Sequence, residues 1–344
     1  MDTSVPPIRR RRTTVTAGAE LVGVRPLDGF DGLAAVVAPA FPDVDLAAWL
    51  AGHRERVDEL LLSHPALLFR GFAIGSVAEF DRVAAATAPE LLDYVYGSTP
   101  RSRESGNVFS STEYPADQTI PLHNEMAYTT SWPMKLWFCC LVPAATGGQT
   151  PLADSRRVLS AIPADVVERF ERHGVAYIRN YGGGLDLPWQ DVFQTSDRAE
   201  AERFCAEHDI EFEWRGADRL WTRQVCQATA IHPRSGERTW FNQAHLFHVS
   251  ALPEEVRTPL LSAVGEDGLP RNACYGDGSP IGEELETVRA AFQAAERAFA
   301  WQAGDAVLVD NVLAAHGRRP YSGARKVVVA MAESTTAPKE ATRD

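Results

Sequence analysis

Short apolar runs recur along the chain, and most of them are bounded by Gly, Pro, Asn or Asp. Such runs predict β-strands, and they lie at residues 66–72, 135–142, 175–181, 239–244, 305–311 and 326–332. They cluster in the middle and at the end of the chain, with helical patterns outside and between them. This arrangement favours a β-sandwich or jelly roll with helices packed on it over a doubly wound parallel sheet.

Four other segments carry helical spacing or the residues that end helices. Ser76 and Glu79 form a capping-box pattern before an apolar stripe at helical spacing. Pro163 and Gly174 are expected to begin and end a second helix. Asp197, with an acidic residue three positions later, opens a third helix, and residues 281–299 predict a longer amphipathic one.

The organisation of the 344 residues predicts one domain. Between the two ends the chain has no linker, repeat or low-complexity tract, so the domain is expected to span residues 19–334. Residues 1–18 are expected to form a flexible basic tail and residues 335–344 a polar C-terminal tail. The four arginines at 9–12 precede a segment too polar for a secretion signal. No run approaches the roughly 18 apolar residues of a membrane span, so we expect no membrane partner.

Composition and charge exclude further classes. The formal net charge is -12, from 34 basic and 46 acidic side chains, which argues against a nucleic-acid or anionic-membrane partner. The five cysteines include no CxxC pair, which argues against a structural zinc finger. A low, odd number of cysteines is typical of a reducing compartment, so we expect a cytoplasmic protein.

Two His-x-Glu triplets are the first candidates for chemistry, and their settings differ. His53 and Glu55 lie in a segment of helical spacing, where positions i and i+2 point to different faces. His123 and Glu125 lie in a segment without helical period, and on an extended strand their side chains share a face. His316, shortly after an apolar strand, is the strongest candidate for a third ligand. Two imidazoles and a carboxylate leave three positions of an octahedral ion open, as non-haem Fe(II) oxygenases require.

The motifs around these residues cover most of the chain. They are Leu122-His123-Asn124-Glu125, Gly147-Gly148-Gln149-Thr150-Pro151, Asp310-Asn311, His316-Gly317-Arg318 and Arg325. In this order and spacing, the sequence from about residue 66 to 332 resembles the iron(II)/2-oxoglutarate dioxygenases of the taurine dioxygenase (TauD/TfdA) and clavaminate synthase type. Residues 111–115, 240–248 and 275–278 are most similar to the SyrP-like amino-acid β-hydroxylases of nonribosomal peptide clusters.

The resemblance implies a fold and a set of cofactor-binding residues. The fold would be mainly β with peripheral helices, on a double-stranded β-helix (jelly-roll) core with a large insertion at about residues 180–282. His123, Glu125 and His316 would bind Fe(II). Thr150 would hydrogen-bond the cosubstrate 2-oxoglutarate, and Arg325 would hold its distal carboxylate, to which a guanidinium fork is well matched. Nearby alternatives to Arg325 are Arg318, Arg319 and Lys326. Dioxygen would complete the reactants.

The resemblance also implies a reaction and a substrate class. We expect hydroxylation of an unactivated C–H bond, at the β-carbon, of an amino acid or amino-acid-derived substrate in secondary-metabolite biosynthesis, free or tethered to a carrier protein. Residues 327–332 contain no second arginine for a sulfonate, so taurine is not expected. The carboxylate of Glu125 argues against a halogenase. Polar residues that could contact the substrate are Tyr128, Asn242 and Arg223, and Arg179 is a further candidate. Residues of these types are more often structural.

Other functions fit parts of the same pattern. His245 and His248 could pair on a helix in a zinc hydrolase, but no glutamate stands in HExxH spacing beside them. A non-catalytic jelly roll that binds a small ligand is a second alternative. A third keeps the cofactors but leads to desaturation, cyclisation or epimerisation, because the placement of the substrate decides the product.

Overall fold

The computed structural model describes residues 20–88, 90–99, 101–111 and 114–337. The basic tail expected at residues 1–18 lies outside the described residues, as do residues 338–344 of the expected C-terminal tail. Residues 335 and 336, which were expected in that tail, belong instead to the last strand, where Thr335 pairs with Trp132.

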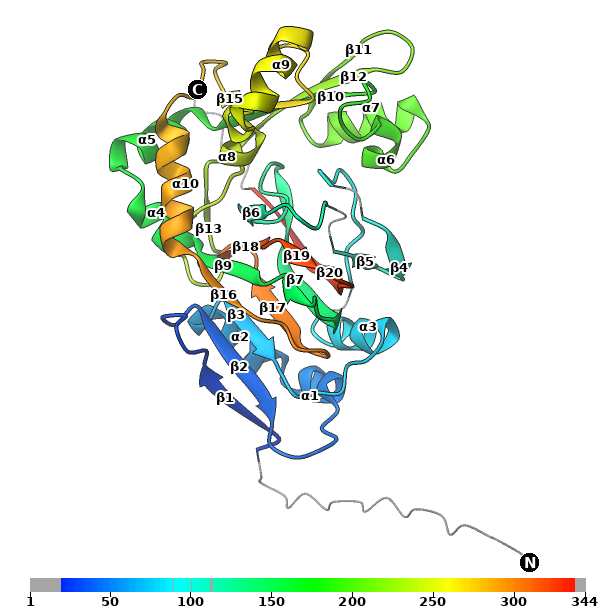
Figure 1. Cartoon of the computed structure of the whole chain (residues 1–344), viewed down its shortest axis with the longest axis vertical. Coiled ribbons are helices and arrows are strands. Elements are labelled where there is room, and N and C mark those ends of the chain that lie inside the picture. The colour runs from blue at the N-terminus through cyan, green and yellow to red at the C-terminus, as the bar shows by residue number, and fades with distance from the viewer. Residues whose placement is uncertain (1–19, 89, 100, 112–113, 338–344) are drawn as a thin grey trace, which may run out of the picture.

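The largest layer is an eight-stranded sheet that crosses the lower and middle parts of Figure 1. Its strands, in order, are β1 (Val22–Pro26), β2 (Ala34–Pro39), β3 (Ala66–Phe69), β17 (Ala306–Asp310), β7 (Ser131–Val142), β20 (Lys326–Thr336), β5 (Val108–Ser110) and β4 (Arg103–Ser105). Neighbouring strands are antiparallel except β2 and β3, which are parallel. Four of the predicted strands meet at the centre of this sheet, although they are far apart in the sequence.

A second, antiparallel sheet faces the first. Its strands, in order, are β16 (Arg297–Phe299), β9 (Thr150–Asp154), β18 (Ala314–Arg318) and β6 (Ile120–His123). Buried apolar side chains of both sheets, including Phe138, Leu152 and Val329, form one cluster. Along β7 the side chains alternate, so Cys140 lies in this cluster and Cys139 lies on the opposite face. The mainly β architecture with peripheral helices is therefore confirmed.

Three helices near the N-terminus cover the outer face of the large sheet: α1 (Leu46–Gly52), α2 (Arg54–Ser63) and α3 (Val77–Ala85). The capping box predicted at α3 is present. The Ser76 hydroxyl accepts a hydrogen bond from the Glu79 N–H, and the Glu79 carboxylate accepts from the Gly75 N–H and the Ser76 hydroxyl. Both ends of this motif are thus satisfied locally, which explains why the sequence pattern located the helix.

Most of the remaining elements form an upper lobe in Figure 1, which packs on the small sheet through one apolar cluster. Its sheet has the order β11 (Glu211–Trp214), β12 (Leu220–Cys226), β10 (Val175–Tyr181) and β15 (Arg271–Tyr275), and β13 (Thr229–Ile231) pairs with β14 (Arg238–Trp240). Its helices are α4 (Ser155–Ala161), α5 (Ala164–His173), α6 (Trp189–Phe193), α7 (Arg198–Glu207), α8 (Ala244–Phe247), α9 (Glu254–Val264) and α10 (Glu284–Ala295), with the 3₁₀ turn Val249–Ala251. Most of residues 180–282, the expected insertion, lie in this lobe.

Two predicted elements differ in extent from those observed. The helix expected over residues 281–299 ends at Ala295, because the following residues pair with β9 as strand β16 and bury Phe299. The strand expected over residues 239–244 ends at Trp240. There the Asn242 side chain donates to Ala228 O and accepts from the Ala244 N–H, and this turns the chain into α8.

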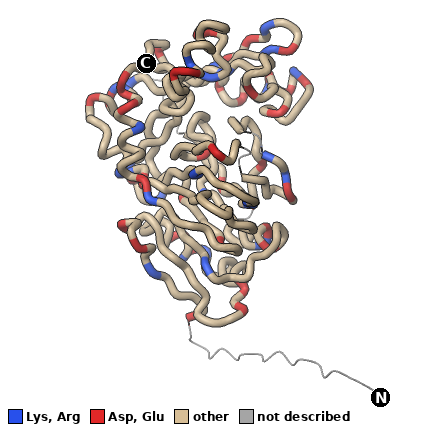
Figure 2. The backbone as a smooth tube through the Cα atoms, in the orientation of Figure 1, with Lys and Arg blue, Asp and Glu red and all other residues tan. Residues whose placement is uncertain are grey.

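In the described segments no helix combines the length and apolar character needed to cross a bilayer. Acidic and basic residues alternate along the outer loops and helices (Figure 2), and both signs occur on the two lobes.

The cysteines allow a first prediction. Burial raises the pKa of the Cys139 and Cys205 thiols to about 12 and that of Cys140 to about 11. At pH 8 only about one such thiol in a thousand, or fewer, is ionised, and the thiolate is the reactive form. We expect Ellman's reagent to react slowly with the native protein and to count five thiols after unfolding. Rapid reaction of several thiols in the native protein would contradict this burial.

Candidate metal centre and cofactor pocket

Two strands of the small sheet bring His123 and His316 together. His123 is the last residue of β6, His316 is the central residue of β18, and the two are paired across the antiparallel ladder. Their ring centroids are 4.4 Å apart. Directly opposed residues of neighbouring strands point to the same face. Residues almost 200 positions apart in sequence therefore present their imidazoles to one point.

Glu125 reaches the same point from a turn. The expected extended strand ends at His123, and Met126 has a positive φ of 57°, so the chain bends directly after the glutamate. The side chain of Asn311, between β17 and β18, fixes this bend. Its Oδ1 accepts from the Glu125 N–H over 2.7 Å, and its Nδ2 donates to Glu125 O over 2.9 Å. The convergence expected from a strand is thus achieved by a turn clamped to a distant residue.

The three side chains form a compact donor set. One ligand atom each of His123, Glu125 and His316 lies within 4.8 Å of the others, and Glu125 Oε2 is 3.9 Å from His316 Nε2. In the described part of the chain no other group of three His, Cys, Asp or Glu side chains meets this condition. His245 and His248 do not form a second set, because His245 Nε2 donates to Leu122 O and His248 contacts Ser250.

Protonation of the two histidines also suits a metal. His123 Nδ1 lies 2.9 Å from Pro121 O, which can only accept, so the proton resides on Nδ1 and the Nε2 lone pair faces the site. Burial lowers the pKa of His123. Burial, with the nearby His123 and Arg101, lowers the pKa of His316 well below its usual value. Neutral imidazoles are the form that binds metals, and two of them with one carboxylate fit Fe(II).

A cavity of about 40 Å³ adjoins this donor set, and Thr150 and Arg325 line it together with His123 and His316. The Thr150 hydroxyl accepts a hydrogen bond from Trp301 Nε1 over 2.9 Å, which leaves its own proton to donate. Arg325 Nε is buried without a partner, and desolvation lowers the pKa of its guanidinium. Both residues therefore have unused hydrogen-bond donors beside the donor set.

A glycine turn makes room for Arg325. β8 (Thr146–Gly147) pairs with β19 (Tyr321–Ser322), and Gly148 follows with a φ of 70°. A Cβ on Gly148 would approach Arg325 Nε to 3.2 Å and Ala144 Cβ to 3.0 Å. A side chain there would therefore be strained and would also crowd the guanidinium.

The basic residues named as alternatives to Arg325 have other partners. Arg318 donates to the main-chain oxygens of residues 114, 115 and 118. Arg319 pairs with Glu296, and Lys326 pairs with Glu104. Arg325 makes one long hydrogen bond, 3.5 Å from Nη1 to Ser111 Oγ, so among these four side chains its guanidinium is the least committed.

The polar residues named for substrate contact lie outside this cavity. Tyr128 is buried and donates to Tyr96 O over 3.1 Å. Asn242 is buried and holds the turn before α8. Arg223 pairs with Glu211 and donates to Gly276 O on the upper lobe. The structure does not bring these three together with the donor set.

Sequence reasoning missed one residue at the site. Arg101 lines the cavity, and its Nη2 donates to Glu125 Oε2 over 2.6 Å. Nothing in the local pattern singles it out, because it lies in an irregular segment 24 positions before Glu125.

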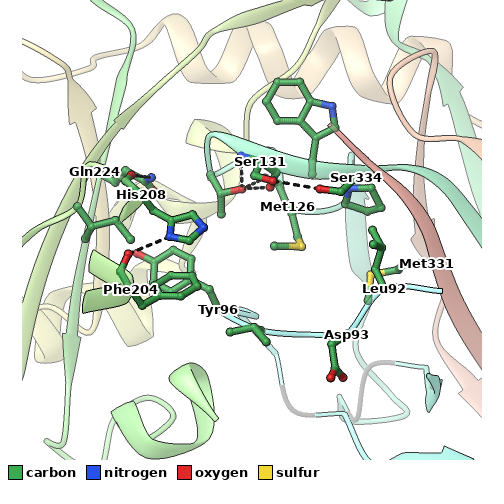
Figure 3. Close-up of a pocket in the computed structure, with 15 residues that line it drawn as sticks. Leu92, Asp93, Tyr96, Met126, Ser131, Phe204, His208, Gln224, Met331 and Ser334 are labelled. Atoms are coloured by element: carbon green, nitrogen blue, oxygen red, sulfur yellow. Dashed lines mark hydrogen bonds between the residues drawn. The ribbon is translucent and has the colours of Figure 1, made fainter. Parts of the chain in front are cut away.

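A second, larger cavity of about 190 Å³ is shown in Figure 3. Tyr96, Met126, His208 and Met331 are among the side chains around it, and the His208 ring is held by Phe204 O. Met126 borders this space, whereas Glu125, one residue earlier, points to His316. The residues predicted to bind iron and 2-oxoglutarate do not line it.

Comparison of the sequence with models of known protein families identifies its family. A family model described as "Taurine catabolism dioxygenase TauD, TfdA family" matches residues 24–331. The chain belongs to this family. Membership confirms the expectation of a non-haem iron, 2-oxoglutarate-dependent dioxygenase with a jelly-roll core. It also confirms the expected cofactors Fe(II), 2-oxoglutarate and O₂.

Two curated proteins are similar to this chain over most of their length. The dapdiamide synthesis protein DdaC of Enterobacter agglomerans is 41% identical over 309 residues, which cover 90% of this chain and 93% of DdaC. A clavaminate synthase-like protein of Arabidopsis thaliana is 31% identical over 289 residues, with 80% and 83% covered.

Solved structures share the fold at lower sequence identity. PvcB of Pseudomonas aeruginosa superposes with a TM-score of 0.54 at 17% identity, covering 94% of each chain. A second PvcB structure is described as an Fe, alpha-ketoglutarate dependent oxygenase from an isonitrile synthetic pathway. AAD-2, solved with Mn(II) and N-oxalylglycine, has a TM-score of 0.51 at 13% identity, with 92% of this chain and 98% of AAD-2 covered.

Proposed function

We propose that this chain is a hydroxylase that uses Fe(II), 2-oxoglutarate and O₂ to attack an unactivated C–H bond, at the β-carbon, of an amino acid or amino-acid-derived substrate. The observation that carries this proposal is the convergence of His123, Glu125 and His316 within 4.8 Å, beside a cavity that also contains Thr150 and Arg325.

Each of these residues has a defined part in the proposal. His123, Glu125 and His316 would hold Fe(II), which together with 2-oxoglutarate and O₂ supplies the oxidising chemistry that side chains lack. Arg325, whose Nε has no partner in the described structure, would present its guanidinium to the distal carboxylate of 2-oxoglutarate. The Thr150 hydroxyl, oriented by Trp301, donates to a carboxylate oxygen. The buried surroundings exclude water from the reacting groups.

The relatives support the substrate class. DdaC is described as a protein of dapdiamide synthesis, and PvcB as an oxygenase of an isonitrile pathway. We therefore place the substrate among amino-acid-derived secondary metabolites, either free or tethered to a carrier protein. A cytoplasmic setting belongs to the proposal, because free thiols such as those of Cys139 and Cys140 and ferrous iron both require reducing conditions.

Anaerobic spectroscopy tests the function. The protein with Fe(II) and 2-oxoglutarate is expected to develop a visible charge-transfer band, which one group of free or carrier-loaded amino acids then perturbs. Admission of O₂ should yield succinate in step with consumption of that substrate. A product that gains one oxygen atom supports hydroxylation, whereas loss of two hydrogens or an inverted stereocentre would replace it by desaturation, cyclisation or epimerisation.

Calorimetry separates an enzyme from a binding protein. 2-Oxoglutarate is expected to bind only when Fe(II) or Mn(II) is present, because the metal completes its site. Equal affinity with and without metal, together with no succinate above the uncoupled background, would overturn the proposal in favour of a non-catalytic jelly roll.

A further inference from the structure

A buried guanidinium lies beside the predicted iron ligands and has no part in the function proposed above. The side chain of Arg101 is 3% exposed, and its Nη2 donates to Glu125 Oε2 over 2.6 Å. The ring of Tyr94 lies against it, with the guanidinium carbon 4.4 Å from the ring centroid. Arg101 lines the same cavity as Thr150 and Arg325. It is therefore held in place at the metal end of the cofactor pocket.

Arg101 uses only part of its hydrogen-bond capacity. A guanidinium carries five N–H donors, and in the described structure Nε and Nη1 of Arg101 are buried without a partner. A buried charged donor that is left unpaired costs free energy, and the cost is larger than for a neutral group. The neighbouring Arg318 leaves its Nε unpartnered as well, but its two other nitrogens donate to three main-chain oxygens. The unused donors of Arg101 are therefore available to a ligand.

The charges around Glu125 point to the sign of that ligand. Among the described ion pairs, Glu125 is the acidic partner of Arg101. The same oxygen, Oε2, accepts from Arg101 and lies 3.9 Å from His316 Nε2. A metal ion held there would share this single carboxylate with the guanidinium. Excess positive charge in a low-dielectric site attracts an anion.

We propose that Arg101 binds a carboxylate at the metal end of the cavity through its unpartnered N–H groups. This inference rests on the proposed function and adds a second carboxylate-binding residue to Arg325. The carboxylate belongs either to the keto-acid end of 2-oxoglutarate or to the substrate, and both present the same chemistry to the guanidinium. Because of Arg101, the site requires a ligand that carries a carboxylate at this position, whereas the three metal ligands alone would not require one.

Calorimetry with Mn(II)-loaded protein tests the first source. The variants are Arg101→Met, which keeps a side chain against Tyr94 but removes the charge, and Arg103→Met as control. Arg103 is more exposed and pairs with Asp93, outside the cavity. The probes are 2-oxoglutarate and 2-oxopentanoate, which keeps only the carboxylate beside the keto group. If Arg101 holds that carboxylate, Arg101→Met weakens both probes by about 10- to 100-fold, and Arg103→Met weakens neither.

The anaerobic Fe(II)/2-oxoglutarate absorption band tests the second source. If Arg101 holds the substrate carboxylate, Arg101→Met binds both oxo acids as the wild type does. Free amino acids then perturb the wild-type band but not that of Arg101→Met, and the corresponding carboxamides perturb neither.

Three results distinguish a failure of this inference from a failure of the proposed function. Wild-type behaviour of Arg101→Met in both assays would overturn the inference and leave the proposed function standing. Loss of Mn(II) binding in Arg101→Met would overturn it as well, because Arg101 would then serve only to support Glu125. Failure of the wild type to bind 2-oxoglutarate with metal would overturn the proposed function and this inference with it.

Discussion

His123→Ala is expected to abolish turnover and to weaken metal-dependent binding of 2-oxoglutarate by at least about 100-fold. The variant removes one of three donor atoms that lie within 4.8 Å of one another, and neither Glu125 nor His316 can move to replace it. Glu125 is held by Asn311, and His316 lies within the β18 ladder. Two remaining donors provide too few bonds to retain the ion against water.

A thermal-shift measurement checks metal binding without turnover. At a Mn(II) concentration of about 100 times Kd, the metal should stabilise the wild type by about 2.7 kcal/mol, and His123→Ala should gain nothing. His53→Ala is the matched control, since His53 belongs to the other His-x-Glu triplet, is exposed and stacks on Trp49. Retained activity in His123→Ala with loss in His53→Ala would reverse the assignment.

Local signals in the sequence predicted the helix ends well. The N-terminus of α3 and the limits of α5, set by Pro163 and Gly174, agree with the prediction. Each depends on contacts within one turn of helix, which a short sequence pattern contains in full. The central strands were also located, because their apolar runs are buried on both faces.

Contacts between distant segments explain the elements that the sequence did not locate. Residues 297–299 continue an amphipathic helical pattern, yet they pair with β9, and the energy of that pairing is absent from the local pattern. The same holds at residue 242, where the Asn242 side chain bonds to Ala228 O, 14 positions earlier. Propensity is a weak guide wherever such tertiary pairing competes with it.

The candidate site, too, was predicted where it depends on local patterns and was missed where it depends on contacts between distant segments. Residue types and spacing were enough to select His123, Glu125 and His316, and the structure brings them together. The route differs from the expected one, because Glu125 lies in a turn whose shape depends on Asn311. Arg101 could not be found from the sequence, since its relation to Glu125 arises only in the folded chain.

Arg325→Met is expected to weaken 2-oxoglutarate binding by between about 30-fold and a few thousand-fold, corresponding to about 2–5 kcal/mol. The reason is that no other basic side chain of the cavity can take its place: Arg318 is bound to main-chain oxygens, and Arg101 is held at the metal end beside Glu125. Loss of the guanidinium would leave the distal carboxylate buried without a counter-charge. Calorimetry with Mn(II)-loaded protein measures this directly.

A comparison of two oxo acids shows whether Arg325 binds the distal carboxylate in particular. 2-Oxopentanoate lacks the distal carboxylate, so Arg325→Met should bind it about as well as the wild type does. Arg319→Met is the control, because Arg319 is partly exposed and pairs with Glu296 outside the cavity. Arg325→Lys keeps the charge but not the planar fork, and an intermediate affinity is expected. If Arg325→Met weakened the binding of both oxo acids equally, Arg325 would not be binding the distal carboxylate, and its assignment would be wrong.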